Sequence, residues 1–572
     1  MRRFLTATLL SLFFTGALLF AQDKPLPPPK DFKPETRRPG DALPALNLPE
    51  YVITGSDVAS FTDDRKGVIG DPDERGLLAR AGRGEREQRF MSTHPTRLPL
   101  ALVSPKGIQN VLSVKAGYGS FETPSVQAWY ANRFSDADVA IDGSWEKSRG
   151  HVRLADYEQG HVHANAGTWL PKTSLPFFAS SRIEGDFRYE GTSYGLYADK
   201  LQQSLPLLDF QRDADHMHFR GSLISRKNPV FDHDVSAFFA STTLREHLSL
   251  RDSLPIETWD QAELRAGIDI HTRHGIFGIP VVTRGEFHFG DVKPKDKEAS
   301  APFYNRIGAE GRHSITDALW LDAGLDLYLF RGSEEAVSMR LYPEARLSLR
   351  LHDDYVSWFA FEPEVRETTF DGMRRINPFL MLASDVRHTD IPLRFSTGVA
   401  FDDRRSTSGR LYAEYLSTSS WPRFDLLDDP VRQQWQLRYG ASSSIFALHL
   451  ELHHRFNKRT RIQVDAAVRS SHDDELDASI PYLPSLELRT LLSHVFPFGL
   501  NVEATAQLVG SQFTQEGDVP ASMLLGFGAE YRLFDSVGVF LQASNLLDND
   551  YQRWRGYQER PLFVIGGIIV RF

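Results

Sequence analysis

The chain of 572 residues contains no cysteine. This absence excludes disulfide bonds, a thiol nucleophile, zinc sites built on cysteine and a lipid-modified N-terminal cysteine. Beyond the N-terminus the sequence also lacks any apolar run near the roughly 18 residues that a membrane helix needs, so a helical membrane protein is excluded. The net charge is −10, and both signs are spread along the chain. No concentrated basic face of the kind that binds nucleic acid is present.

The first 21 residues have the pattern of a secretory signal peptide. Arg2 and Arg3 form a short positive region, an apolar run covers residues 4–20, and the small residue Ala21 precedes polar residues. This order predicts export from the cytoplasm and cleavage after Ala21. The alternative interpretation is a membrane anchor, but the run is short and no stop-transfer charges follow it.

Three further regions follow along the chain. Residues 22–46 are rich in proline and charge, which predicts an extended, flexible periplasmic lead. Residues 47–107 are mixed in composition and include an arginine-rich stretch near 80–89, which we expect to be a solvated face. From about Ile108 to Phe572 apolar and polar residues alternate in segment after segment. We therefore expect one large β-domain over residues 108–572 behind a short, mostly irregular N-terminal part.

The alternation is clearest in residues 319–329, 337–351, 446–456 and 500–508, where one face is apolar and the other carries full charges. Strands of a soluble β-sandwich also alternate apolar and polar residues, so the pattern by itself does not distinguish a sandwich from a membrane barrel. These segments, however, reach the roughly 9–11 residues of a tilted membrane strand, and about twenty of them follow one another behind a signal peptide. Because every backbone polar group must be paired in hydrocarbon, strands can span a membrane only as a closed barrel.

The connections between these segments alternate in length. Short polar turns lie at 135–136, 316–317, 353–354, 457–458 and 535–536. Longer loops lie near 148–158, 190–213, 246–257, 291–301, 471–482, 512–520 and 548–561. Short periplasmic turns and longer outside loops are typical of outer-membrane barrels, so we predict an all-β fold, a large closed antiparallel transmembrane barrel of about 22 strands. Both chain ends would then be periplasmic. Turns in residues 368–445 cannot be assigned consistently to either side.

The C-terminal part carries a more specific pattern. Residues 537–551 contain Asn545, Leu546, Asp548 and Tyr551, and the terminal segment 562–572 ends on an aromatic residue. This arrangement resembles the C-terminus of TonB-dependent receptors, which have the pattern Asn-Leu-x-Asp-x-x-Tyr before their last strand. The resemblance implies a signal for barrel closure and membrane insertion, read by the barrel-assembly machinery, at the outward positions Gly566, Ile568, Val570 and Phe572.

A second resemblance lies near the N-terminus. Residues 48–55 are similar to the stretch by which these receptors add a strand to a periplasmic energy-coupling protein of the TonB type. The resemblance assigns this role to Glu50, Tyr51, Val52, Ile53, Thr54 and Gly55. The alternative is an ordinary strand of a small N-terminal fold. Residues 56–107 are too few for the family's plug domain, and its motifs are not legible, so the plug is expected to be reduced or missing.

Several polar pairs and charges are candidates for sites. Histidine pairs on one side of a strand occur at His161/His163, His216/His218 and His449/His453, the last with Glu451 on the same face. Zinc or copper would need further ligands from neighbouring strands, and we expect a polar lumen lining without a metal site or cofactor. Inward charges are expected to form opposite-sign ladders across strands, at Arg340, Glu344, Arg346 and Arg350. Interfacial aromatic girdles are expected at Trp129, Trp145, Tyr531, Phe534 and Trp554.

No combination of nucleophile, base and orienting group stands in a catalytic motif, so we do not expect an enzyme. The resemblance implies a protein of the outer membrane that transports a solute through its barrel, energised through residues 50–55. The alternative is a plugless barrel that acts as a passive channel or as a scaffold for partner proteins. Expected partners are outer-membrane lipid, the barrel-assembly machinery, a TonB-type protein and a transported ligand. The location of residues 56–107 would discriminate between these two functions. Folding inside the lumen would favour gated transport, and a position in the periplasm would favour an open pore or a barrel blocked by a partner.

Overall fold

The computed structural model describes residues 110–572, with gaps at 135–136, 171–177, 179–180, 199–207, 226–231, 251–254, 277–278, 295–298, 334–335, 383, 404–405 and 428–432. All described residues belong to one of the two units into which the chain divides, Ile53–Phe572. The predicted signal peptide, the lead 22–46 and the region 47–107, including Glu50 to Gly55, lie outside the described residues. In the described part, no helix is long and apolar enough to cross a membrane.

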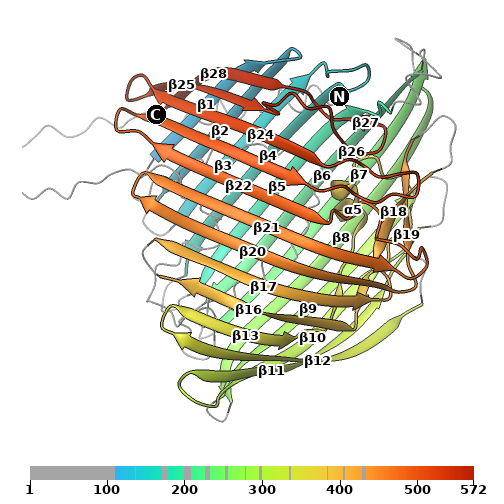
Figure 1. The fold of residues 1–572 in the computed structure, drawn as a ribbon, viewed down its shortest axis with the longest axis vertical. Coiled ribbons are helices and arrows are strands. Elements are labelled where there is room, and N and C mark those ends of the chain that lie inside the picture. The colour runs from blue at the N-terminus through green and yellow to red at the C-terminus, as the bar shows by residue number, and fades with distance from the viewer. Residues whose placement is uncertain are drawn as a thin grey trace, which may run out of the picture. The chain divides into compact units, whose positions relative to one another are not determined.

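Twenty-two strands form one antiparallel sheet (Figure 1). They are β1 (Asn110–Gly119), β2 (Thr123–Arg133), β3 (Ala137–Ser148), β4 (Tyr157–Trp169), β5 (Arg182–Gly195), β6 (Leu208–Ser225), β7 (Asp232–Leu250), β8 (Pro255–Ile276), β9 (Ile279–Pro294), β10 (Phe303–Ser314), β11 (Leu319–Arg331), β12 (Ser338–His352), β13 (Tyr355–Phe361), β16 (Leu393–Asp402), β17 (Thr407–Thr418), β20 (Ser443–Asn457), β21 (Thr460–Asp473), β22 (Leu486–Val495), β23 (Leu500–Val509), β24 (Ser522–Arg532), β25 (Val537–Ser544) and β28 (Phe563–Arg571).

The sheet closes on itself because β1 pairs with both β2 and β28. In the closing pair Gly117 lies opposite Gly567, and Val114 lies opposite Val570. Closure leaves no free sheet edge, which is the condition for strands in hydrocarbon. The predicted fold class and the number of about 22 strands are confirmed.

Shorter elements lie in the connections between barrel strands. They are β14 (Glu364–Arg366), α5 (Phe370–Ile376), β15 (Thr389–Ile391), β18 (Pro422–Leu426), β19 (Trp435–Tyr439), β26 (Gln552–Trp554) and β27 (Tyr557–Gln558). These elements pair among themselves in two-stranded sheets, β14 with β15, β18 with β19 and β26 with β27. The turns in region 368–445 could not be assigned to one side of the barrel from sequence. The region holds two connections that contain such shorter elements, β13 to β16 and β17 to β20.

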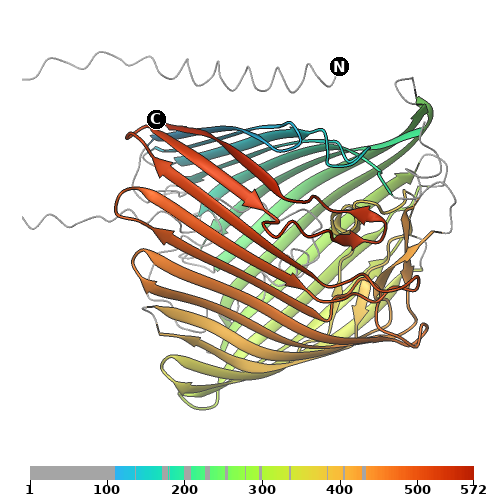
Figure 2. The same cartoon turned by 45° about the horizontal axis from the view of Figure 1, so that its top comes forward.

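The two ends of the barrel differ (Figures 1 and 2). The C-terminus lies at one end, called here the turn end, with short turns such as those after β12 and β20. The short turns predicted at 316–317, 353–354, 457–458 and 535–536 all join barrel strands of the structure. The opposite end, called the loop end, carries β18, β19, β26 and β27.

Two predicted loops are wrong. The expected loop 246–257 is mostly strand, because β7 continues to Leu250 and β8 begins at Pro255; the expected loop 190–213 likewise includes the end of β5 and the start of β6. Strands β6, β7 and β8 have 18, 19 and 22 residues, more than a membrane crossing needs. In their loop-end parts the inward residues include Arg212 and Glu246, and outward positions such as Gln211 on β6 are polar as well, so the alternation of apolar and polar residues ends there.

The barrel has apolar side chains on its outer face and charged side chains inside, the reverse of a soluble protein. On β11 the side chain of Leu325 is 49% exposed, whereas Asp326 is 1% exposed. The apolar row therefore faces outward and the charged row faces the lumen, as the alternation predicted. Inside, Arg306 donates to Asp326 at 2.6 Å and Arg312 donates to Asp322 at 2.6 Å.

The predicted ladder residues take part in this lumen lining. Arg340 donates to Asp390 at 2.8 Å, Arg346 lies 3.3 Å from Glu362, and Glu344 accepts from Arg284. The guanidinium of Arg350 lies 5.8 Å from the centre of the Trp320 ring. Three of the four residues thus pair with opposite charges, and the fourth makes a cation–π contact.

The aromatic girdle prediction holds only in part. Tyr531 and Phe534 are exposed near the turn end, and Trp145 is partly exposed, with its Nε1 donating to Glu158 at 3.2 Å. The girdle prediction is wrong for Trp129, which lies opposite the inward residue Ser113 and is buried. The prediction is also wrong for Trp554, which is buried in a cluster of apolar residues at the loop end. The position of a residue near a strand end does not show whether its side chain faces inward or outward. The strand register decides this.

Candidate functional site at the loop end of the barrel

One connection folds back into the barrel. The inserted segment, residues 362–392, leaves β13 and returns as β16, and Phe361 at its start pairs with Phe395 just after its end. It contains β14, α5 and β15, and Figures 1 and 2 both show α5 within the ring of strands near the loop end. The barrel does not need this segment for its own strand pairing.

Helix α5 forms where local signals favour a short helix. Thr369 is the N-cap, its side chain accepting from the N–H of Gly372 at 3.0 Å, and Asp371 in the first turn suits the helix dipole. The helix ends at Asn377, whose N–H donates to the carbonyl of Met373, and a proline follows. Sequence reasoning missed this helix, although Thr369 and the three-residue spacing of Phe370, Met373 and Ile376 could have signalled it.

Buried apolar side chains join the inserted segment to the other loops. This mouth cluster consists of Leu154, Leu196, Ala198, Phe210, Ala214, Leu244, Phe370, Met373, Ile376, Phe379, Leu380, Leu382, Val386, Phe424, Trp435, Leu437, Tyr482, Val519, Trp554 and Tyr557. The rings of Phe379 and Tyr557 stack with centroids 3.5 Å apart, and Trp435 lies 5.7 Å from Tyr557 and 5.9 Å from Tyr482. Side chains from seven connections, together with residues of β6 and β7, therefore form a core at the loop end.

The long strands hold the inserted segment by its backbone. The carboxylate of Glu263 on β8 accepts from the N–H groups of Phe370 at 3.1 Å and Asp371 at 2.9 Å, at the start of α5. On β6 the fully buried Arg212 donates to the carbonyl of Pro378, and to that of Leu380 at 2.7 Å. Arg212 also pairs with Glu246 on β7, which accepts from Gln434 at 3.1 Å.

Ion pairs add further attachments to the barrel wall. Glu367 of the inserted segment accepts from Arg265 at 2.5 Å and contacts His288 at 2.8 Å. Burial alone would raise the pKa of Glu367, but Arg265 and His288 lower it well below its usual range. Arg375 at the end of α5 donates to Glu190 on β5 at 2.7 Å. The segment is thus tied to β5, β6, β8 and β9, well away from β13 and β16, from which it arises.

The histidine pairs line the wall without forming a metal centre. His161 Nε2 and His163 Nδ1 both contact Asp142, at 3.1 Å and 3.0 Å, and His163 Nε2 contacts Asp186 at 2.6 Å. Among the described residues no group of three or more histidine, aspartate or glutamate side chains is arranged to hold a metal ion.

The other two pairs also have protein partners. His216 contacts Thr242 at 2.9 Å and lies 3.4 Å from Asp371 of α5. His449 stacks on Tyr412, while Glu451 accepts from Arg410 at 2.6 Å rather than joining the histidines.

The C-terminal pattern residues organise a loop that reaches the mouth cluster. Asn545 is buried with φ +50°, and its Nδ2 donates to the carbonyls of Asn549 at 2.9 Å and Arg560 at 3.2 Å. Asp548, with φ +51°, accepts from the N–H of Leu562 at 2.8 Å. These left-handed residues end β25 at Ser544.

Two other residues of the pattern lie in the same connection. Leu546 is exposed, and its N–H donates to the carbonyl of Leu525 at 2.9 Å. The carbonyl of Tyr551 accepts from the N–H of Glu559 at 2.9 Å, and burial raises the pKa of the Tyr551 hydroxyl to about 12. The loop 545–562 delivers Trp554 and Tyr557 to the mouth cluster.

The last strand places the proposed insertion signal on the outer face. Gly566, Ile568 and Val570 alternate with the inward residues Ile565 and Ile569 along β28, and Ile568 is exposed. Phe572 is 73% exposed, and its backbone exchanges two hydrogen bonds with Leu112, at 2.8 Å and 3.2 Å. These residues complete the barrel closure; their recognition by an assembly machinery stays a prediction.

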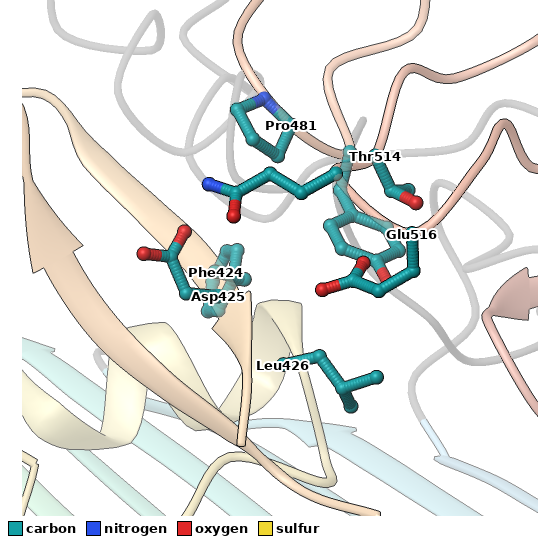
Figure 3. Close-up of a pocket in the computed structure, with 8 residues that line it drawn as sticks. Phe424, Asp425, Leu426, Pro481, Thr514 and Glu516 are labelled. Atoms are coloured by element: carbon teal, nitrogen blue, oxygen red, sulfur yellow. The ribbon is translucent and has the colours of Figure 1, made fainter. Parts of the chain in front are cut away.

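The outer surface of the mouth cluster has a shallow pocket (Figure 3). It is formed by three separate connections and is lined by Phe424, Asp425, Leu426, Pro481, Tyr482, Thr514, Gln515 and Glu516. Phe424 and Tyr482 also belong to the mouth cluster, so the pocket borders that cluster. Burial raises the pKa of Asp425, and Glu516 adds to this rise.

The barrel is similar in fold to solved outer-membrane proteins. The FrpB iron transporter from Neisseria meningitidis (F3-3 variant) matches with a TM-score of 0.62 at 10% identity, over 81% of this chain and 82% of that chain. The copper transporter OprC matches with a TM-score of 0.60 at 11% identity, over 81% and 80%. The siderophore receptor PiuA from Acinetobacter baumannii matches with a TM-score of 0.59 at 11% identity, over 81% and 82%. No family model and no curated protein sequence matches this chain.

Proposed function

We propose that this chain is an outer-membrane transporter whose loop end faces outward and is closed at rest by the inserted segment and the mouth cluster. The wide 22-strand barrel with its apolar outer face and charged lumen supports the membrane location. Its fold is also that of proteins named as iron and copper transporters and a siderophore receptor. The transported solute would enter from outside and leave at the turn end, into the periplasm.

The apolar core at the loop end is the observation that carries this proposal. A passive channel of this width would need an open path, whereas here side chains of seven connections pack into one apolar core at the loop end. The buried Arg212 of β6 adds a polar anchor, because its hydrogen bonds to the carbonyls of Pro378 and Leu380 must break before the inserted segment can leave the lumen. A closed, anchored mouth favours gated transport over the alternatives of a passive channel and a scaffold.

Gated transport needs a source of energy or ligand binding to shift the closed state, because an equilibrium moves only by a difference in interaction free energy. We propose that residues Glu50 to Gly55 supply the link to a TonB-type protein, by strand addition as their resemblance implies. They lie before β1, which starts at the turn end, so a coupling protein in the periplasm could reach them.

Conductance across planar bilayers tests the closed mouth. Residues 364–391 can be replaced by a short glycine–serine linker, because the flanking strands β13 and β16 are already paired at Phe361 and Phe395. We compare the full mature chain, a variant lacking residues 22–107, the linker variant and the combination of both changes.

We expect the full chain and the variant lacking 22–107 to stay closed, since both keep the mouth, and the combined variant to conduct. Steady large conductance of the full chain would instead support a passive channel. Conductance on removal of 22–107 alone would show that the mouth does not seal the barrel and would overturn the proposal.

A further inference from the structure

We infer that His388 makes the closed mouth sensitive to acid, releasing the inserted segment when its ring gains a second proton. This inference rests on the proposed closed mouth. His388 lies at the end of the inserted segment, next to β15, and is buried. Its ring joins the two ends of the segment to each other and to the barrel wall.

The hydrogen bonds of His388 fix its protonation state. The backbone N–H of Thr368, at the other end of the inserted segment, donates to Nδ1 at 3.1 Å. Nε2 lies 3.1 Å from the carbonyl oxygen of Phe303 on β10, which can only accept, so Nε2 carries the proton. The closed mouth therefore requires the neutral ring, with one acceptor and one donor. A second proton on Nδ1 would face the Thr368 N–H and set two donors against each other.

The backbone of His388 has a further role in the junction. Its carbonyl accepts from the hydroxyl of Ser420 at 3.0 Å, and the same hydroxyl accepts from the N–H of Asp390 at 3.0 Å. Ser420 lies in the connection that carries β18 and β19. Displacement of His388 would therefore disturb contacts of a second loop of the mouth as well as those of Thr368.

The ring also borders a small polar cavity between the wall and the inserted segment. The cavity encloses about 10 Å³, room for about one water molecule, which can deliver a proton. Besides His388, its lining includes Glu263, Arg265, His288, Phe303, Glu367 and Thr368. On its other sides the ring of His388 packs edge-on against Tyr304 of β10 and Phe330 of β11, with centroids 5.9 Å and 6.0 Å away.

The charged neighbours of His388 are already paired. Glu367 is held by Arg265 and His288, and Glu263 accepts from the start of α5. His288 faces the carboxylates of Glu367 at 2.8 Å and Asp269 at 2.7 Å, one on each ring nitrogen, so both nitrogens must donate and its ring is charged. Acid would not change His288 in this arrangement, which leaves His388 as the ring of this junction that must gain a proton.

Burial lowers the pKa of His388 below its ordinary value, although Glu367 acts in the opposite direction. A histidine freed into water has an ordinary pKa of about 6.5. Below about that pH the open state therefore binds more protons than the closed state, and the closed state loses stability as pH falls. Above it, both states hold a neutral ring and the closed mouth keeps its full stability.

The absence of cysteine allows a direct test by thiol labelling. Ser384 in the inserted segment is buried, so a maleimide should reach the thiol of Ser384→Cys only when the mouth opens. Ala521→Cys, in the exposed connection before β24, provides the reference, and the ratio of the two rates at each pH removes the effect of thiol ionisation. The full chain in nanodiscs is used throughout.

We expect the labelling ratio to rise by up to about tenfold between about pH 7.5 and about pH 5.5, the limit set by a freed histidine of pKa about 6.5. In the background of His388→Gln, whose amide offers one acceptor and one donor without titrating, the ratio should change little with pH. His352→Gln, at an exposed histidine of β12, should leave the wild-type response intact.

The outcomes separate the two proposals. Slow labelling at both pH values would keep the closed mouth and overturn the role of His388. A pH response that persists in His388→Gln would also overturn it. Fast labelling at neutral pH in the wild-type background would overturn the closed mouth itself. If His388→Gln does not assemble, His388→Asn provides the same test with a shorter amide.

Discussion

At the residue scale, Asn545 shows how one side chain can shape a whole loop. Its amide satisfies the backbone of Asn549 and Arg560 while its own backbone takes the left-handed conformation that ends β25. Asparagine is among the few residues that adopt this conformation readily. The pattern Asn-Leu-x-Asp-x-x-Tyr is therefore a structural requirement of the loop that carries Trp554 and Tyr557.

Asn545→Ala should destabilise the folded barrel by about 1–3 kcal/mol, because two partly buried backbone carbonyls lose their donor. The temperature at which the protein loses its resistance to SDS on a gel should fall accordingly. Asn549→Ala is the matched control, since that side chain makes an exposed hydrogen bond to Met523. Equal loss in both variants would contradict the role assigned to Asn545.

Phe572 presents the opposite case, a side chain that the folded barrel hardly uses. Because it is largely exposed, its replacement should not affect stability once the barrel has formed. We expect Phe572→Ser to lower the amount of assembled protein in the membrane, and Phe572→Tyr to keep it, with equal SDS resistance of whatever assembles. Deletion of residues 571–572 should have a larger effect, since it also removes the bonds to Leu112. Normal assembly of Phe572→Ser would disprove an insertion signal at this side chain.

At the scale of elements, the length of β6, β7 and β8 is explained by what they hold. Their loop-end parts carry Arg212, Glu246 and Glu263, which anchor the inserted segment through its backbone. A buried ion pair contributes little net stability, but removal of one partner leaves an uncompensated charge. Substitution of one anchor alone should therefore weaken the attachment of the inserted segment more than substitution of both partners of an ion pair.

Arg212→Met should loosen the inserted segment by about 3–5 kcal/mol, because it leaves Glu246 buried without its cation and two carbonyls without a donor. We expect faster maleimide labelling of Ser384→Cys at neutral pH. Addition of Glu246→Gln should restore part of the slow labelling, since it removes the buried charge. Arg245→Met is the control, because Arg245 on β7, next to Glu246, pairs with Asp260 at 2.8 Å where both side chains are partly exposed. Unchanged labelling in Arg212→Met would exclude Arg212 as an anchor.

At the scale of the whole molecule, the proposed function places the closed mouth and the coupling strand on opposite sides of the membrane. If Glu50 to Gly55 add to a sheet edge of a TonB-type protein, affinity comes from their main-chain hydrogen bonds. Proline at Val52 or Ile53 removes a donor and fixes φ, so either change should abolish binding while leaving the barrel intact. Thr54→Ala should have a much smaller effect.

A peptide of residues 45–60 and the periplasmic domain of a TonB-type protein allow this to be measured directly. We expect binding by the wild-type peptide and by Thr54→Ala, and none by Val52→Pro. Failure of the wild-type peptide to bind, or equal binding by the proline variant, would remove energised transport and leave a barrel without this coupling.

The sequence by itself determined the barrel. A membrane strand is exposed to lipid on one face and to the lumen on the other, so each segment must alternate regardless of its neighbours, and residues 319–329 or 500–508 show this locally. The closing pattern at Asn545 and the terminal strand to Phe572 are local as well. Strand number and fold class followed from counting such segments behind the predicted signal peptide.

Only the tertiary structure decided how the loop end is closed. The contacts of the mouth cluster join residues as distant in the chain as Leu154 and Tyr557, and no period in the sequence encodes such a meeting. Within a segment, period 2 does not distinguish a girdle tryptophan from a lumen tryptophan such as Trp129, because strand register fixes which face turns inward. His388 likewise gained its significance only when folding placed Thr368 on one ring nitrogen and Phe303 on the other.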